Sequence, residues 1–410
     1  MANSLYICYF GVREPLVQTQ VIPYLRELIK GGHEISLLTF EPAALTETQQ
    51  NSIQDTLRAD GIEWHSLKYH KRLSVIATAW DIFQGARFIR KFIARENPNI
   101  LHGRVHVPTL MAAIARKFSR HKPKILFDIR GFMPEEYTDA GLWSPDGILY
   151  RIAKRVERWL MAVSDGFVVL TEKARSILFP ESRESGFDRS RRPIEVIPCC
   201  VDFDRRFVEF SDDEKLRLRK TLGTTDRLVI THVGALTGLY LVNEIAEFLQ
   251  TAKASDPSTF ALLLTQTQPA EIIAKLKECG FSEADYLVSR VPPAEVQQYL
   301  ESSDLALSFV RAGYATASRS PTKIPEYLAC GLPIIANSGV GDVDELINGH
   351  KVGVVLNSFN TDEFKRGLSE ALELGDISIR CRETARREFE LQSIGGVRYR
   401  RLYDRLTKEI

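Results

Sequence analysis

Residues 320–336 read Ser320-Pro321-Thr322-Lys323-Ile324-Pro325-Glu326-Tyr327-Leu328-Ala329-Cys330-Gly331-Leu332-Pro333-Ile334-Ile335-Ala336. The stretch predicts a helix start, a short helix, a glycine stop and a buried strand. We expect Ser320 to cap the helix and Pro321 to take its first position. The N–H that proline lacks would have no hydrogen-bond partner within the helix at that position. Gly331 suits the helix end, and the apolar run after it suits an interior parallel strand. The stretch therefore favours an α/β fold.

The start of this helix is also a candidate phosphate site. Free amides and a partial positive charge at a helix N-terminus attract anions, and Thr322 and Lys323 add a hydroxyl and a cation. Glu326 lies about 6 Å further along the helix, where a carboxylate accepts hydrogen bonds from a ribose. The alternative interpretation is an ordinary capped helix with a surface glutamate.

This segment resembles the nucleotide-binding element of retaining glycosyltransferases of the GT-B fold, in particular glycosyltransferase family 4. There the second glutamate of a Glu-x7-Glu motif binds the ribose of a nucleotide sugar, and Glu326 matches it. Ser318 stands at the first position, a departure that affects the usual contact to the donor sugar. The resemblance implies a set of donor-binding residues in this segment: Arg319, Ser320, Thr322, Lys323 and Glu326.

Length and composition indicate two globular domains. A chain of 410 residues exceeds one ordinary core, and its 44% hydrophobic and 26% charged residues are typical of soluble proteins. A mildly basic first half and a mildly acidic second half fit no nucleic-acid partner. The six cysteines lack metal-ligand spacing and are expected to be free thiols in a reducing compartment. Without a signal-peptide pattern or a membrane-spanning run, we expect a cytoplasmic protein.

Two strand–glycine–helix patterns predict two doubly wound sheets. An apolar strand at residues 5–10 leads through Gly11 into a helix at about 18–30, and a strand at 227–233 leads through Gly234 into a helix at 242–252. Ligands bind beyond the carboxyl ends of such strands, so both glycines are candidate donor-binding residues. The resemblance implies a GT-B fold, with two facing Rossmann-like domains and a cleft between them. Its parts would be an acceptor-binding domain (1–205), a nucleotide-sugar-binding domain (206–385) and a C-terminal helix (386–410) that packs back on the first domain.

Polar residues gather after two strands of the first half. Residues 99–106 read as a strand that leaves into a loop, and residues 124–131 read as the next strand. The run Asp-x-Arg-Gly…Glu-Glu…Gly-Leu-Trp at 128–143 looks like a signature of one branch of family 4. A cation here would stabilise the departing diphosphate or orient an acceptor. The candidate catalytic residues are Arg104, His106, Asp128, Arg130 and Glu136. The alternative for Asp128 and Arg130 is a pair that only braces a loop.

The loop after Gly234 departs from the family. Family 4 enzymes usually carry a basic residue just after this glycine and a lysine a few places on, which clamp the diphosphate; Ala235 and Leu239-Tyr240 stand there. The charge must then come from Lys323, Arg319 or arginines of the first half. Two further donor-binding candidates, Arg290 and Val291, lie where the family's backbone contacts the base.

No metal or cofactor is predicted, and the nucleoside-diphosphate sugar is a substrate. Asp202-Phe203-Asp204 superficially matches the Asp-x-Asp metal motif of a different fold, GT-A. Its place at the domain boundary, and not after an early apolar strand, makes the match coincidental.

Two basic amphipathic helices leave two interpretations open. Arg87, Arg90, Lys91 and Arg95 mark one, and Arg151, Lys154, Arg155 and Arg158 mark the other. They are either solvated surface helices or a peripheral docking face for the inner, anionic surface of a membrane, where lipid-linked acceptors are found.

The sequence thus predicts a metal-independent, hexosyltransferase-type retaining glycosyltransferase that moves a sugar from a nucleoside-diphosphate sugar to the hydroxyl of a sugar or lipid-linked sugar acceptor. Cell-surface polysaccharide or glycolipid synthesis is the family's commonest setting. Two alternatives stay open: a GT-B nucleotide-sugar epimerase, which needs no acceptor, and a non-catalytic nucleotide-sugar-binding partner subunit.

Overall fold

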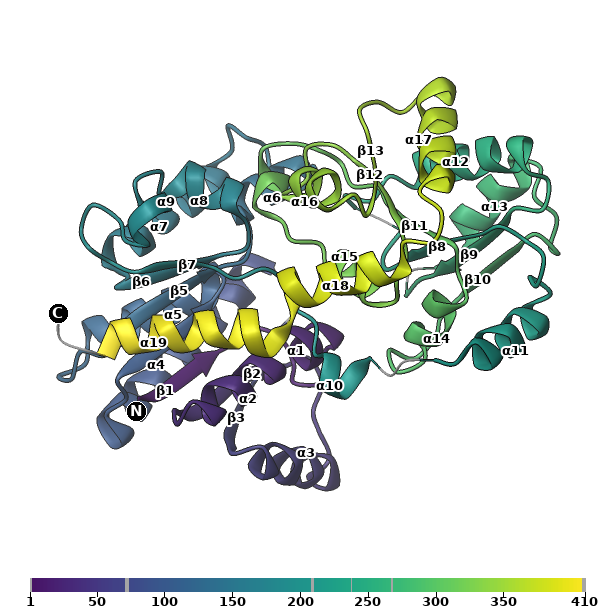
Figure 1. Cartoon of the computed structure of the whole chain (residues 1–410). Coiled ribbons are helices and arrows are strands. Elements are labelled where there is room, and N and C mark those ends of the chain that lie inside the picture. Colours follow the sequence, from purple (N-terminus) through teal and green to yellow (C-terminus); the bar gives the residue numbers. More distant parts are fainter. Residues whose placement is uncertain (1, 71–73, 208–209, 237, 267, 408–410) are drawn as a thin grey trace. The chain divides into compact units, whose positions relative to one another are not determined.

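The computed structural model describes residues 2–70, 74–207, 210–236, 238–266 and 268–407. The chain divides into two compact units. Unit 1 comprises the described residues of Met1–Pro198 and Leu391–Ile410, and unit 2 is built from Cys199–Glu390. Each unit contains one parallel sheet with helices connecting its strands (Figure 1).

The sheet of unit 1 has, within the described residues, seven parallel strands in the order β3-β2-β1-β4-β5-β6-β7. Their bounds are β1 (Asn3–Ile7), β2 (Glu34–Glu41), β3 (Ile62–Lys68), β4 (Ile100–Arg104), β5 (Lys124–Ile129), β6 (Gly166–Val169) and β7 (Ile194–Val196). The central strands β1, β4, β5 and β6 are almost wholly buried, as expected for a parallel sheet covered on both faces, whereas the edge strand β3 is partly exposed.

The helices of unit 1 connect these strands. They are α1 (Pro15–Gln20), α2 (Ile22–Lys30), α3 (Glu47–Ala59), α4 (Ser74–Glu96), α5 (His106–Lys117), α6 (Met133–Asp139), α7 (Ile148–Val163), α8 (Glu172–Leu178) and α9 (Ser182–Ser185). The single helix expected at about 18–30 is wrong, because it breaks at Val21. Pro23 has no N–H to continue the ladder of hydrogen bonds, which explains the break.

The sheet of unit 2 has, among the described residues, six parallel strands in the order β10-β9-β8-β11-β12-β13. Their bounds are β8 (Val229–Val233), β9 (Phe260–Leu264), β10 (Tyr286–Ser289), β11 (Leu305–Ser308), β12 (Ile334–Asn337) and β13 (Gly353–Leu356). In each sheet the chain first adds strands on one side of its first strand and then adds the remaining strands on the other side. This switch lies between β1 and β4 in unit 1, and between β8 and β11 in unit 2. Such a switch point is where open α/β sheets bind ligands.

The helices of unit 2 surround this second sheet. They are α10 (Phe203–Arg206), α11 (Asp212–Leu222), α12 (Val242–Ser255), α13 (Ala270–Glu278), α14 (Val296–Glu301), the 3-10 helix η1 (Ala315–Ser318), α15 (Lys323–Ala329), α16 (Val343–His350), α17 (Thr361–Glu373) and α18 (Ser378–Phe389).

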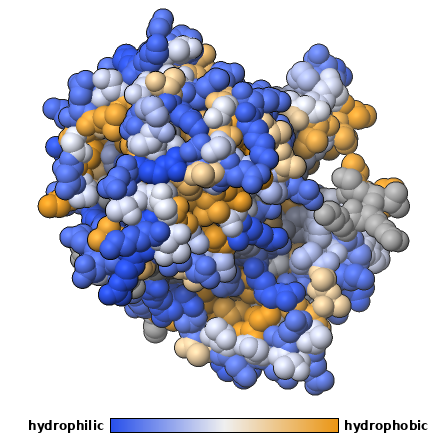
Figure 2. All heavy atoms as spheres, turned by 90° about the vertical axis from the view of Figure 1, so that its right-hand side faces the viewer, coloured by the Kyte–Doolittle hydropathy of each residue, from blue (hydrophilic) through white to orange (hydrophobic). Residues whose placement is uncertain are grey.

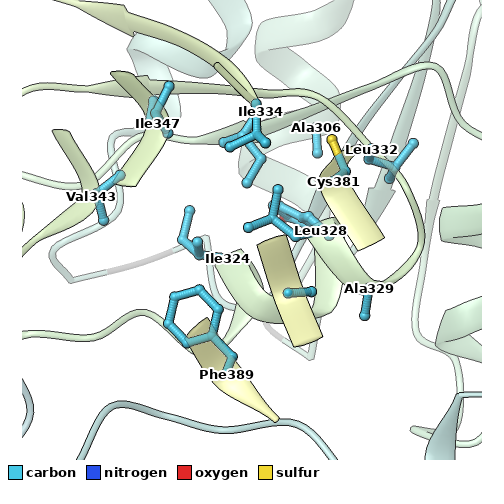
Figure 3. Close-up of a cluster of buried hydrophobic side chains, with 14 of the residues drawn as sticks. Ala306, Ile324, Leu328, Ala329, Leu332, Ile334, Val343, Ile347, Cys381 and Phe389 are labelled. Atoms are coloured by element: carbon cyan, nitrogen blue, oxygen red, sulfur yellow. The ribbon is translucent and has the colours of Figure 1, made fainter. Parts of the chain in front are cut away.

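A buried apolar cluster fixes α15 in unit 2. Ile324 and Leu328 on one side of the helix lie among apolar side chains of β12, α16 and α18 (Figure 3). Each side chain of this size contributes roughly 1.5–3 kcal/mol when fully buried. The helix that carries Lys323 and Glu326 is therefore held firmly against its own sheet.

The end of the chain is not one continuous helix, so the expected helix at 386–410 is wrong in this respect. Residues 386–389 close α18, Glu390 is extended, and a π-helix, η2 (Leu391–Gly396), leads into α19 (Val397–Thr407). The Val201 N–H donates to the Phe389 carbonyl (2.8 Å), which fixes the point where α18 ends. η2 and α19 pack on α2, and α19 also packs on β4 and β7, within unit 1. Residues 408–410 lie outside the described part.

The molecular surface mixes hydrophilic and hydrophobic residues on the face drawn in Figure 2. In the described part of the chain, no helix is both long and apolar enough to span a bilayer.

Candidate functional site

The switch point of unit 2 carries a buried lysine. Lys323, the first residue of α15, is only 3% exposed. Its Nζ lies 3.3 Å from Nε2 of His232 on β8 and 4.0 Å from the centroid of the Tyr240 ring. Gly234 follows β8 in a positive-φ conformation (φ +121°), and a Cβ built there would lie 3.5 Å from the same Nζ. The lysine thus lies directly beside the loop of Gly234, a residue that the sequence predicts to bind the donor.

The electrostatics of this lysine are unusual. Burial lowers the pKa of Lys323 to about 7, and Glu326 opposes the shift only in part. Among the described residues, no carboxylate forms an ion pair with Lys323. An ammonium group in this position would have an aromatic face and an imidazole as neighbours, but no counter-ion. Such a site favours the arrival of an anion.

His232 is a neutral histidine with a defined tautomer. Burial, and then the positive charge of Lys323, lower its pKa well below the usual value. Nδ1 lies 3.2 Å from the Leu307 carbonyl oxygen, closer than Nε2 lies to the Ala235 carbonyl oxygen (3.4 Å). An ammonium at Lys323 can only donate to Nε2, so we assign the proton of the neutral ring to Nδ1. Nε2 then keeps its lone pair and accepts from the Lys323 amine. In this tautomer Nε2 carries no proton, so it does not donate a hydrogen bond to the Ala235 carbonyl oxygen 3.4 Å away.

Tyr327 joins the two strands that flank the switch point. Its buried hydroxyl accepts from the Val233 N–H (2.8 Å) and donates to the Leu307 carbonyl (3.3 Å). The hydroxyl therefore fixes the end of β8 against β11, beside Lys323. Thr237, in the same glycine loop, lies outside the described residues.

The helix start differs from the expectation. α15 begins at Lys323, with Thr322 as its N-cap residue and no side-chain cap, so the predicted cap at Ser320 is wrong. The Ser320 hydroxyl instead accepts from the Cys199 N–H (3.1 Å), and Pro321 lies in the turn before the helix, where its carbonyl accepts from the Ile324 N–H (3.1 Å). Thr322 is half-buried at the mouth of the same turn.

The remaining donor-binding candidates of unit 2 lie in different surroundings. Glu326 is half-buried in the first turn of α15, and Arg319 is half-buried just before that helix. Ser318, at the place of the family's first glutamate, is buried and donates to the Ala315 carbonyl (2.8 Å) within η1. Arg290 is exposed and its Nε donates to Gln266, whose amide also donates to the Val291 carbonyl (3.3 Å).

Asp128 is the centre of a buried cluster at the carboxyl edge of the sheet of unit 1. Its Oδ2 lies 3.1 Å from Nε of Arg130 and 3.8 Å from a terminal nitrogen of Arg104, and it accepts from the Tyr399 hydroxyl (3.0 Å) on α19. Burial alone would raise the pKa of the Asp128 carboxyl, but Arg130 and the other neighbouring groups lower it to about 2. Asp128 therefore stays ionised and holds both arginines and α19 in place.

His106 belongs to a separate network between α5, α6 and α7. Its Nε2 lies 3.0 Å from a Glu157 carboxylate oxygen, and Glu157 in turn contacts Lys154. Lys154 also pairs with Glu135 (3.0 Å). The structure thus separates His106 from the Arg104–Asp128–Arg130 cluster with which the sequence grouped it.

Two further candidates of unit 1 are closely packed. A Cβ on Gly11 would lie 2.8 Å from Pro42, and the Val12 N–H donates to the buried Glu41 carboxylate (2.9 Å), so the loop needs glycine for packing. Glu136 lies against Gly131, where a Cβ would be only 2.4 Å from its carboxylate oxygen.

Sequence reasoning missed two contributors. His232 is a lone histidine inside the apolar strand Val229–Val233, and that contrast was the available signal. Tyr399 gave none, because its partner Asp128 is 271 residues away. No group of three or more metal-ligating side chains occurs among the residues that the structure describes. Metal independence stays a prediction.

Two family models match the chain. Residues 17–205 match the model described as Glycosyltransferase Family 4, and residues 214–388 match Glycosyl transferases group 1. No curated protein gives a match to the chain.

Solved structures share the fold along the whole chain. A glycosyltransferase from Rickettsia africae has a TM-score of 0.73 at 15% identity, covering 100% of this chain and 99% of that one. HepE from Anabaena, solved with UDP and glucose, has a TM-score of 0.68 at 14% identity (98% and 100% covered). WaaG, a glycosyltransferase involved in lipopolysaccharide biosynthesis, has a TM-score of 0.65 at 14% identity (99% and 100% covered).

The two parallel sheets and these matches define a GT-B-like fold of two Rossmann-type domains. The chain belongs to glycosyltransferase family 4, whose members are retaining enzymes that transfer a sugar from a nucleotide sugar.

Proposed function

We propose that unit 2 binds a nucleoside-diphosphate hexose and that the enzyme transfers the hexose to the hydroxyl of a sugar or lipid-linked sugar acceptor bound by unit 1. The observation that carries the donor site is Lys323, a buried lysine at a switch point beside a glycine loop, with no ion-pair partner among the described residues. A donor diphosphate supplies the missing negative charge. Lys323 then does the work of the basic clamp that is absent at Ala235 and Tyr240.

The other donor residues act around this charge. Glu326, one turn further along α15, accepts hydrogen bonds from the ribose, while Arg319, Ser320 and Thr322 line the approach to the phosphates. Gly234 lets backbone approach the donor, and the base lies beside Arg290 and Val291. HepE, a protein of the same fold, has been solved with UDP and with UDP-glucose, which supports a uridine donor here.

The proposed reaction retains the configuration of the transferred sugar. The nucleoside diphosphate leaves, stabilised by Lys323, and the acceptor hydroxyl attacks from the same face. A phosphate oxygen of the leaving group helps to remove the hydroxyl proton. Among the unit 1 candidates, Arg104 and Arg130 supply positive charge, Asp128 holds them, and His106 and Glu136 orient the acceptor.

The setting that we propose is cell-surface polysaccharide or glycolipid synthesis, with peripheral association at the inner face of a membrane. The basic helices α4 and α7 support this setting, as does the fold shared with WaaG.

Thermal unfolding with a panel of UDP, GDP, ADP, CDP and dTDP tests the donor site. A ligand at about 1,000 times its Kd adds about 4 kcal/mol to the free energy of unfolding. We expect one base to stabilise the wild type, and Glu326→Ala to lose most of that shift because the ribose contact is gone. Glu278→Ala, an exposed glutamate on α13, is the matched control and should keep it. No shift with any nucleotide would overturn the proposal.

A further inference from the structure

We propose that donor binding is coupled to the uptake of one proton by the Lys323 amine, and that His232 is the residue that positions this amine. The inference rests on the proposed function, because it concerns the same diphosphate site. In the free protein the amine donates a hydrogen bond to His232; in the donor complex it becomes an ammonium that pairs with the diphosphate. The new N–H bond takes its proton from the solvent buffer, and no other bond changes.

In the free protein the surroundings of the Lys323 amine stabilise a positive charge only weakly. Lys323 is 3% exposed, so water screens it poorly, and its Nζ lies 3.3 Å from an imidazole nitrogen and 4.0 Å from the centroid of the Tyr240 ring. The ring face attracts an ammonium but carries no net negative charge to neutralise it. A buried charge of this kind costs several kcal/mol without a counter-ion. An incoming diphosphate removes this imbalance.

His232 suits the positioning role because its ring proton is on Nδ1, the nitrogen that does not face Lys323. Nδ1 donates to the Leu307 carbonyl, which leaves Nε2 as an acceptor aimed at Lys323. A protonated His232 would repel the ammonium, and burial keeps the ring neutral. The imidazole therefore holds the amine at the glycine loop in either protonation state of the lysine.

Few other titratable or charged groups surround this pair. Glu326 lies one turn away on α15 and acts on Lys323 electrostatically. Burial raises the pKa of Tyr240, on which Arg319 and the Cys199 thiol act as neighbouring groups, and also raises that of Tyr327. Both tyrosines therefore remain protonated at neutral pH. Lys323 is the group of this cluster that gains or loses a proton near neutral pH.

The expected pH dependence follows from the free-state pKa of about 7. Below this value the amine already carries its proton, so binding takes up little. Above it the proton must be acquired on binding, so uptake approaches one and affinity falls as pH rises. Between about pH 6 and about pH 8 the affinity should fall about tenfold.

Isothermal titration calorimetry in two buffers of different ionisation enthalpy measures this uptake directly. The probes are UDP-glucose, ADP-glucose, GDP-mannose and dTDP-glucose, whose diphosphate diesters do not titrate in this range. We expect uptake near one proton at about pH 8 and near zero at about pH 6. A donor that binds with no uptake at either pH overturns the inference while leaving the proposed function intact. If no probe binds at any pH, the proposed function and this inference fail together.

Three variants separate positioning from mere folding. Lys323→Met should abolish the uptake and flatten the pH profile, whereas Lys253→Met, a lysine that pairs with Asp285 in the same unit, should leave both unchanged. His232→Phe should move the midpoint of uptake to lower pH, because the amine loses a polar neighbour. A purely structural role for His232 would weaken binding equally at every pH and leave the midpoint in place; that result overturns the positioning role.

Discussion

Asp128 shows how one buried carboxylate can serve several partners. It contacts Arg130 and Arg104 and accepts from the Tyr399 hydroxyl, all inside unit 1. Its negative charge is therefore needed for stability as well as for holding two cations at the carboxyl edge of the sheet. Any catalytic effect of changing Asp128 has to be separated from this structural role.

We expect Asp128→Asn to lower the free energy of unfolding by about 3 kcal/mol at neutral pH, because it removes the buried negative charge beside the Arg104 and Arg130 guanidinium groups. Tyr399→Phe removes only one hydrogen bond and should cost about 1 kcal/mol. Urea-induced unfolding of both variants beside the wild type measures the difference. Equal effects of the two substitutions would contradict the counter-ion role.

The carboxylate of Asp128 also makes the free energy of unfolding fall at low pH. Its pKa falls from 3.8 to about 2 on folding, so its ionised form contributes about 2 kcal/mol above pH 4. That contribution is fully present above the ordinary pKa and is lost as pH falls through the folded value. Asp128→Asn should remove this part of the acid dependence.

The sequence could predict only those features of the candidate site that depend on neighbouring residues in the chain. The sequence could predict that Lys323 and Glu326 share one short helix, because a proline, a glycine and an apolar strand mark its bounds. The roles of His232 and Tyr240 could not be predicted, since their contacts to Lys323 cross 91 and 83 positions of the chain and depend on packing. The buried state of Lys323, from which its low pKa arises, was equally hidden.

At the scale of elements, the junction of β4 and α5 is a tight strand-to-helix turn. The strand expected within 99–106 is confirmed as β4, but the loop expected after it is wrong, because β4 ends at Arg104 and α5 begins at His106, with Val105 alone between them. Val105 has φ +66°, a conformation that costs a β-branched residue roughly 1–3 kcal/mol. Nothing in the local sequence indicates so abrupt a turn; it is enforced by packing of α5 on its own strand.

Gly103 makes this junction possible, and its substitution tests the packing. A Cβ there would lie 2.4 Å from the Thr109 hydroxyl oxygen and 2.6 Å from its Cα. We expect Gly103→Ala to destabilise the protein by about 3 kcal/mol, because the helix must shift away from the strand. Gly349→Ala on α16, where a Cβ meets nothing within 4 Å, is the control and should be neutral or stabilising by about 0.5–1 kcal/mol. Similar stabilities of the two variants would contradict the close approach.

At the scale of the whole molecule, periodicity was sufficient to predict two doubly wound units. Each begins with an apolar strand, a glycine turn and a helix, and parallel strands follow at regular intervals. The return of η2 and α19 to unit 1 was expected only from family resemblance. Its physical basis is the contact of Tyr399 with Asp128 and of Tyr403 with His102 (2.9 Å), which no local pattern reveals.

The surface of unit 1 supports the last prediction, which concerns membrane association. α5 packs against both α4 and α7, so these two helices lie on the same face of the sheet, and each begins at its carboxyl edge. Exposed apolar residues mark both N-terminal ends, with exposed arginines further along α7. The apolar residues are Val75, Ile76, Trp80 and Phe83 on α4, and Ile148, Leu149 and Ile152 on α7. Apolar side chains beside cations suit an anionic lipid surface, to which each cation adds about 1 kcal/mol.

We expect the protein to sediment with phosphatidylglycerol vesicles at low salt and to be released at high salt, because screening shortens the reach of the arginines. Ile148→Ser with Ile152→Ser should weaken binding, since buried apolar area is lost. Ile379→Ser, which changes an isoleucine that is 72% exposed on unit 2, should have no effect. Binding that high salt leaves unchanged would contradict the docking of these arginines on an anionic surface. Absence of binding at low salt would show that α4 and α7 are simply solvated. In that case the proposed acceptor reaches unit 1 from solution.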